Sequence, residues 1–160
     1  MSERILIVDD EAVLRKNLVR FLTRTGHDVD SAASAEEALS KLETVDYAVV
    51  ITDLKMPGMG GEALLKTVTA EYPETLVLII TAFASLESAI QALRHGAQDY
   101  LLKPLSLDEV SRKVDRLLEF RALEQRVMRL RRDLHRRFDP EDIVAESTSM
   151  KAVMRLVHKA

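Results

Sequence analysis

Residues 49–53 read Val49-Val50-Ile51-Thr52-Asp53, and the turn-rich sequence Leu54-Lys55-Met56-Pro57-Gly58-Met59-Gly60-Gly61 follows. A short, nearly continuous apolar run is typical of a strand that is buried on both faces, as in a parallel sheet. The run ends in a single carboxylate and then breaks. We therefore expect Asp53 to lie at the carboxyl end of a buried strand, where it forms the floor of a site.

Strands and helices alternate on both sides of this stretch. The strands are expected at residues 4–8, 27–33, 47–51, 76–80 and 100–102. Between them, apolar residues recur at helical spacing; the first helix carries Val13, Leu14, Leu18, Phe21 and Leu22. Capping boxes at residues 34–37 and 106–109 indicate two helix starts. Strict alternation with short loops predicts an α/β fold, a doubly wound five-stranded parallel sheet.

The composition indicates a globular protein, because 47% of the 160 residues are hydrophobic and 31% are charged. A net charge of −3 does not indicate a charged partner. The chain has no cysteine, which excludes disulfides and thiol chemistry. It shows neither a signal peptide nor an apolar run near the roughly 20 residues that span a bilayer. We expect a soluble, cytoplasmic protein without a membrane partner.

Polar residues stand at the carboxyl ends of four predicted strands. They are Asp9 and Asp10, Asp53, Thr81 and Lys103. Ligands bind at this edge of open parallel sheets. Clustered carboxylates repel one another and need a cation, and carboxylate and carbonyl oxygens with water suit Mg²⁺. A carboxylate can also attack phosphorus and form an acyl phosphate. In such a site Lys103 supplies positive charge, and the Thr81 hydroxyl can bind a phosphoryl oxygen.

Each of these residues also has an ordinary structural explanation. Asp9 and Asp10 precede a helix, where acids commonly cap free amides. Asp53 could simply begin a loop, Thr81 could reflect strand propensity, and Lys103 could be a solvated charge at an edge. These separate explanations do not account for all of them falling at strand ends of one alternating pattern, so a common site is favoured.

The ordered set of motifs resembles the receiver domain of two-component response regulators. The resemblance covers residues 2–120 and rests on a short list of features: Asp9-Asp10, Asp53 with its following loop, Thr81-Ala82, Tyr100 and Lys103-Pro104. It implies the flavodoxin-like strand order 2-1-3-4-5. It also implies a sensor histidine kinase as partner and a cis peptide bond between Lys103 and Pro104.

The same resemblance assigns roles to single residues. Asp53 is the expected phosphoacceptor. Mg²⁺ is expected on Asp10, on Asp53 and on the backbone carbonyl of Lys55, with Asp9 in support. Lys103 is expected to contact the phosphoryl group. Thr81 and Tyr100 are expected to form a switch in which the hydroxyl moves to the phosphate and the ring turns inward.

The helical pattern that begins near residue 107 continues past a typical receiver. Its apolar face shifts by one position, from Val110, Val114 and Leu117 to a heptad seam made of Phe120, Leu123, Val127, Leu130 and Leu134. The shift predicts a change from packing on the receiver to packing on a partner helix, as the dimer seam of a coiled coil. Residue types at the core positions favour a parallel dimer. The seam is short, so the last receiver helices are expected to contribute to the homodimer.

Residues 121–137 hold seven Arg beside Glu124 and Asp133. A basic module that binds DNA is one interpretation. A solvated coiled-coil surface, or pairing of the Arg residues with acids of a neighbouring domain, is favoured because the segment has no aromatic residue and has Leu or Val at its seam positions. We expect three regions: a receiver at 1–120, a coiled-coil linker helix at 121–138, and the beginning of a further domain at 139–160.

Residues 143–157 resemble the opening of the AAA+ ATPase domain in NtrC/DctD-like, sigma-54-dependent transcriptional activators. The phosphate-binding loop of that domain is not in the sequence. We therefore expect an N-terminal part of a longer activator, not itself an enzyme, that reaches DNA and sigma-54 RNA polymerase only through further domains. The rival enzyme, a Mg²⁺-dependent phosphatase with an Asp nucleophile, usually has a second Asp where this chain has Lys55.

Overall fold

The computed structural model describes residues 3–82 and 86–137, without the side chains of 86–89, 136 and 137. The strands are β1 (Ile5–Val8), β2 (Val29–Ala32), β3 (Val49–Asp53), β4 (Leu76–Thr81) and β5 (Asp99–Leu102). The helices are α1 (Ala12–Arg24), α2 (Ala35–Leu42), α3 (Gly60–Glu71), α4 (Leu86–Arg94) and α5 (Leu107–Arg137). The predicted beginning of an ATPase domain, residues 139–160, lies outside the described residues.

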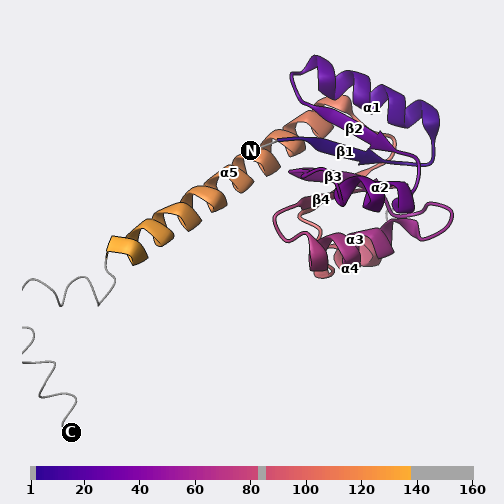
Figure 1. Cartoon of the computed structure of the whole chain (residues 1–160). Coiled ribbons are helices and arrows are strands. Elements are labelled where there is room, and N and C mark those ends of the chain that lie inside the picture. Colours follow the sequence, from indigo (N-terminus) through magenta and orange to yellow (C-terminus); the bar gives the residue numbers. More distant parts are fainter. Residues whose placement is uncertain (1–2, 83–85, 138–160) are drawn as a thin grey trace, which may run out of the picture. The chain divides into compact units, whose positions relative to one another are not determined.

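One parallel sheet organises the described part of the chain (Figure 1). Its strand order is β2-β1-β3-β4-β5, which confirms the predicted fold and order. Val8 pairs with Thr52, and Asp53 pairs with Ile80, so the carboxyl ends of β1, β3 and β4 finish side by side. Strand β2 lies at one edge of the sheet.

Helices cover the sheet on both faces (Figure 1). On one face, Leu18 and Leu22 of α1 share a buried cluster with Val110 and Val114 of α5. On the other face α2, α3 and α4 supply Ala35, Ala38, Leu42, Leu64, Leu65, Val68 and Ala92. Strand residues alternate between the two clusters because successive side chains point to opposite faces. Burial on both faces explains why the strands read as continuous apolar runs.

Two details of the sequence patterns differ in the structure. Val13, placed on the apolar face of the first helix by its spacing, is 68% exposed, because it lies off the stripe of Leu14, Leu18 and Leu22, which follow one another at four-residue spacing and pack against the sheet. The first capping box forms with a changed partner. Ser34 Oγ accepts the Glu37 amide at 3.1 Å, but the Glu37 carboxylate accepts the amide of Ala33, not that of Ser34.

Helix α5 carries two different apolar faces. Val110, Val114, Leu117 and Leu118 are buried, whereas Phe120 is 47% exposed and the seam residues beyond it are exposed as well. The chain divides into two compact units, Met1–Arg121 and Ala122–Ala160. Within the described residues, none of the helices combines the length and the apolarity needed to cross a membrane.

Candidate functional site

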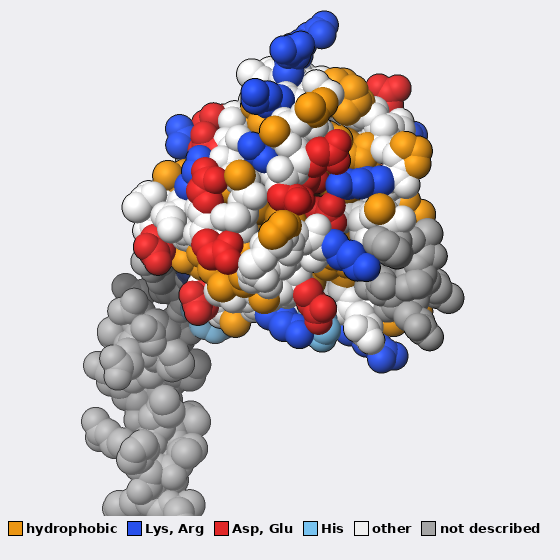
Figure 2. Space-filling view, turned by 90° about the vertical axis from the view of Figure 1, so that its right-hand side faces the viewer, with side chains coloured by type: hydrophobic (Ala, Val, Ile, Leu, Met, Phe, Trp, Pro, Cys, Tyr) orange, Lys and Arg blue, Asp and Glu red, His pale blue; other side chains and the backbone are white. Residues whose placement is uncertain are grey.

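The predicted site residues come from the carboxyl ends of four adjacent strands. Asp9 directly follows β1, Asp53 ends β3, Thr81 ends β4, and Lys103 directly follows β5. Figure 2 views the molecule from the side to which β1 points in Figure 1, and it shows acidic side chains gathered there beside basic ones. Asp9, Asp53 and Thr81 are buried, with residue exposures of 1%, 7% and 2%. The sheet therefore places them together at a recessed edge.

Lys103 joins the two buried carboxylates. Its Nζ lies 2.7 Å from Oδ2 of Asp53 and 3.2 Å from Oδ2 of Asp9. The Lys103 side chain is 20% exposed, and that of Asp53 is 10% exposed. The ammonium thus offsets the repulsion between two carboxylates that are largely removed from water.

This contact changes the acidity of the ammonium. Burial alone would lower the pKa of Lys103. The hydrogen bond and charge of Asp53, followed by those of Asp9, outweigh burial and raise that pKa above its ordinary 10.5. Lys103 is therefore a cation throughout the physiological pH range.

Backbone amides hold the other oxygen of each carboxylate. The amide of Lys55 donates to Oδ1 of Asp53 at 2.9 Å, and the amide of Glu11 donates to Oδ1 of Asp9 at 2.8 Å. Both carboxylates are consequently fixed at two points. Asp10 differs from Asp9, because its side chain is exposed.

The loop between β3 and α3 is shaped by close backbone packing. A Cβ on Gly61 would lie 1.7 Å from the carbonyl oxygen of Asp53, so only glycine fits there. Glu36 of α2 accepts the amide of Met59 at 3.0 Å. Hydrogen bonds from its own amide and that of Met59 lower the pKa of Glu36. Sequence reasoning missed this brace, since a contact across 23 residues leaves no local pattern.

The two predicted switch residues lie on the same face of the sheet. Thr81 pairs with Leu102, and Tyr100 pairs with Ile79, so their side chains project from one side of β4 and β5. The backbone carbonyl of Thr81 accepts the amide of Lys103 at 2.9 Å. Tyr100 is half-buried against the apolar cluster. The Lys103–Pro104 bond is cis, as predicted.

The donor chemistry of this edge fits a hard divalent cation. Asp9 and Asp53 carry buried carboxylates that share one ammonium, and backbone carbonyls and water can complete an octahedron. Within the described part of the chain, the side chains do not bring three acidic, histidine or cysteine groups together in a metal-binding arrangement. The third acid at this edge, Asp10, has an exposed side chain.

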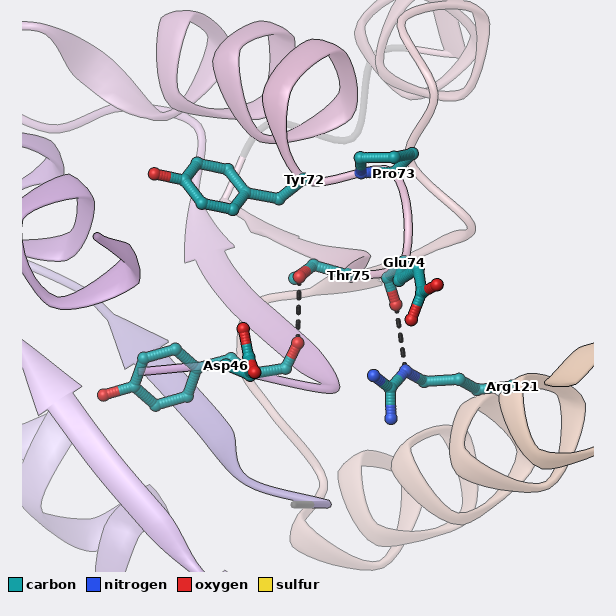
Figure 3. A pocket seen from close by; sticks show the side chains of 7 residues that line it. Asp46, Tyr72, Pro73, Glu74, Thr75 and Arg121 are labelled. Carbon is teal, nitrogen blue, oxygen red and sulfur yellow. Dashed lines mark hydrogen bonds between the residues drawn. The ribbon is translucent and has the colours of Figure 1, made fainter. Parts of the chain in front are cut away.

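A separate pocket of about 240 Å³ lies beyond the opposite ends of the strands (Figure 3). Its lining includes Asp46 and Tyr47, which precede β3, and Thr75, which precedes β4. Thr75 Oγ1 donates to the Tyr47 carbonyl at 2.9 Å. Arg121 Nε donates to the Glu74 carbonyl, also at 2.9 Å. The latter contact attaches α5 to the loop before β4, remote from Asp53.

Comparison with known families agrees with this geometry. The model of the response regulator receiver domain matches residues 5–115. The chain belongs to the response regulator receiver domain family. The receiver therefore acts in a two-component system, and its matched region contains Asp9, Asp53, Thr81 and Lys103.

Similar proteins include two transcriptional regulators that are longer than this chain. The chain is 36% identical over 151 residues to the DNA-binding transcriptional regulator NtrC of Klebsiella pneumoniae, covering 94% of this chain and 31% of NtrC. It is 35% identical over 128 residues to the C4-dicarboxylate transport transcriptional regulatory protein DctD of Rhizobium meliloti, covering 80% of this chain and 28% of DctD. The chain thus spans under a third of the length of either relative.

A solved structure gives the same fold. The response regulator receiver domain protein (CheY-like) of Methanospirillum hungatei superposes with a TM-score of 0.74 at 31% identity. The superposition covers 78% of this chain and 99% of the other. Separately, the sequence similarity to NtrC and DctD confirms the predicted resemblance to NtrC/DctD-like regulators.

Proposed function

We propose that Asp53 is the phosphoacceptor of this receiver and that a sensor histidine kinase is the donor. The single observation that supports this most is the geometry of Lys103, whose ammonium lies 2.7 Å from Asp53 Oδ2 at the ligand-binding edge of the sheet. The Asp53 side chain is 10% exposed, so a donor can reach a carboxylate that is already positioned and partly neutralised.

The chemistry is an exchange at phosphorus. An oxygen of the Asp53 carboxylate forms a bond to the phosphorus of a phosphohistidine, the P–N bond breaks, and the departing imidazole takes up a proton. Mg²⁺, when bound, supplies charge that neutralises the phosphoryl oxygens. Asp10, Asp53 and the Lys55 carbonyl are the proposed ligands, with Asp9 in support. Lys103 contacts the phosphoryl group, and the Thr81 hydroxyl donates a hydrogen bond to it.

The proposed output is a change in the dimer. Thr81 moves toward the phosphoryl group, and Tyr100 turns further into the space behind it. Both residues belong to the strands beside α5, which leads into the linker helix. In the unphosphorylated dimer the downstream ATPase domains are held apart, and phosphorylation releases them. Binding to DNA and control of sigma-54 RNA polymerase are functions of these further domains. The last receiver helices and the linker form the dimer interface.

A small phosphodonor tests the phosphoacceptor. We would incubate the chain with acetyl phosphate and Mg²⁺ and locate the modified residue by mass spectrometry after borohydride reduction of the acyl phosphate. One modification at Asp53 is expected, with no modification of the Asp53→Asn variant. Asp46→Asn, which removes an acid at the opposite ends of the strands, is the matched control and should react normally.

Two results would contradict the proposal. The first is modification of another residue while Asp53 stays intact. The second is steady turnover of phosphate esters by the chain, which would favour the phosphatase that the residue pattern also allows. Solution scattering of the beryllofluoride-treated chain tests the output, because an unchanged dimer geometry relative to Asp53→Asn would refute the proposed dimer switch.

A further inference from the structure

Glu36 places one carboxylate at the beginning of two helices. It belongs to the first turn of α2, and its own backbone amide is one of the groups that its carboxylate accepts. Its Oε1 also accepts the amide of Met59, the residue just before α3, at 3.0 Å. A Cβ on Gly58 would lie 2.8 Å from the same oxygen. The carboxylate of α2 therefore lies directly against the loop that joins β3 to α3.

The sequence of α3 offers a different partner for the Met59 amide. Glu62 is the third residue of α3, the position from which a capping-box glutamate accepts the amide of the residue that precedes the helix. Its Oε1 instead accepts Lys66 Nζ at 3.0 Å and lies 3.7 Å from Nδ1 of His95. An acid from another helix therefore takes the place of the local cap, and the bond ties α2 to the loop.

Hydrogen bonds hold this loop, residues 54–59, at both of its ends. At its first residue, the Leu54 carbonyl accepts the Gly61 amide at 3.0 Å. At its last residue, the Met59 amide donates to Glu36. Lys55 lies in the chain between these two points. Fixing both ends reduces the number of conformations open to the Lys55 carbonyl, and Mg²⁺ requires its ligands near ideal octahedral positions.

We propose that Glu36 is a positioning residue for the Mg²⁺ site and that it acts through the loop on the backbone carbonyl of Lys55. The inference rests on the proposed function, in which that carbonyl is a ligand of Mg²⁺. Glu36 itself does not contact the metal. Residues that orient a metal ligand typically change metal affinity by about 10- to 100-fold. The Glu36 side chain is exposed, so an effect near the lower end of that range is expected.

A Mg²⁺ titration of the full chain, followed by backbone amide NMR, measures this effect. No phosphodonor is present, so the readout is the dissociation constant of Mg²⁺ and not the phosphorylation of Asp53. Two substitutions separate the contact from the charge. Glu36→Asp keeps the charge but withdraws the carboxylate by one methylene from the Met59 amide, and it should weaken Mg²⁺ binding on the order of tenfold. Glu36→Gln removes the charge but keeps an accepting oxygen in place, and it should bind Mg²⁺ nearly as tightly as the unchanged chain.

Glu37→Ala is the matched control. Glu37 is the next residue of α2, and its carboxylate accepts the amide of Ala33 at 2.8 Å, before the helix rather than in the loop. This variant disturbs the beginning of α2 and leaves the bond between Glu36 and Met59 in place. Its Mg²⁺ affinity should therefore equal that of the unchanged chain.

Two patterns would overturn the inference alone. Weak binding by Glu36→Gln together with normal binding by Glu36→Asp would show that only the charge of Glu36 acts on the metal. Normal Mg²⁺ affinity in both variants would show that the bond to Met59 serves only the stability of the fold. Absence of Mg²⁺-dependent shifts in the unchanged chain would instead refute the metal site given under the proposed function, and this inference with it.

Discussion

Replacing Lys103 with methionine removes the charge that separates two buried carboxylates but keeps most of the side-chain volume. The lost contacts are the ones to Asp53 at 2.7 Å and to Asp9 at 3.2 Å. Breaking a fully buried ion pair costs about 3–5 kcal/mol, whereas an exposed pair contributes about 0–1 kcal/mol. Lys103 is 20% exposed and Asp9 only 1%. We therefore expect Lys103→Met to lose about 2 kcal/mol of unfolding free energy at pH 7 in EDTA.

Urea denaturation measures this loss as a lower midpoint with an unchanged slope. A divalent cation should replace the missing ammonium. Saturating Mg²⁺ is accordingly expected to stabilise Lys103→Met more than the unchanged chain, because a ligand that binds only the folded state adds stability in proportion to the logarithm of its concentration. Adding Asp53→Asn to Lys103→Met should also recover part of the loss, since only one buried carboxylate then remains charged.

The matched control is Lys113→Met. Lys113 Nζ also lies 2.7 Å from a carboxylate, that of Asp99, but these side chains are 23% and 26% exposed and the pair is remote from Asp9. This variant should lose less stability, and Mg²⁺ should not restore it. If the two methionine variants lost equal stability and Mg²⁺ affected them equally, the role assigned to Lys103 would be wrong.

Two further predictions concern the loop after β3 and the alkaline stability of the domain. Gly61→Ala should cost about 3 kcal/mol or more and impair phosphorylation of Asp53, because its Cβ would meet the Asp53 carbonyl oxygen at 1.7 Å. The neighbouring Gly60→Ala, whose Cβ has 3.8 Å of space at φ +73, should cost about 1–2 kcal/mol in the same urea assay; equal losses would contradict the packing argument. Burial, reinforced by the hydrogen bond to Asp30, raises the pKa of Tyr47 from 10.0 to about 12. The protonated Tyr47 hydroxyl therefore contributes fully to the free energy of unfolding below pH 10, and this contribution is lost as the pH rises through 12. The free energy of unfolding should fall by roughly 2–3 kcal/mol over that range. Tyr47→Phe should lack this component, so a parallel decline of both proteins would count against it.

The positions of the central strands could be predicted because a strand that is buried on both faces has apolar side chains at successive positions. The convergence of Asp9, Asp53 and Lys103 followed from the same pattern, since parallel strands present their carboxyl ends at one edge. Which of the two adjacent acids is buried could not be predicted from the sequence. Asp9 is buried and Asp10 is exposed, and that choice depends on the direction in which the backbone leaves β1.

Contacts between segments that are distant in the sequence could not be predicted from it either. Glu36 braces the loop at Met59 through a backbone amide, and a backbone amide has no side-chain signature. Val13 shows a different error, because it is apolar but lies outside the four-residue spacing that Leu14, Leu18 and Leu22 share.

One continuous set of contacts leads from Asp53 to α5. The ammonium of Lys103 donates a hydrogen bond to the Asp53 carboxylate, and the backbone amide of Lys103 donates one to the Thr81 carbonyl. Ten positions later, Lys113 of α5 donates to the Tyr100 carbonyl at 2.8 Å and lies 5.4 Å from the ring centroid of the same tyrosine. A phosphoryl group on Asp53 would change the partners of Lys103 first, at the point where β5 ends. Because α5 is fixed to β5 through Lys113, we infer that such a change acts on the helix at the residues that begin it, upstream of the exposed seam.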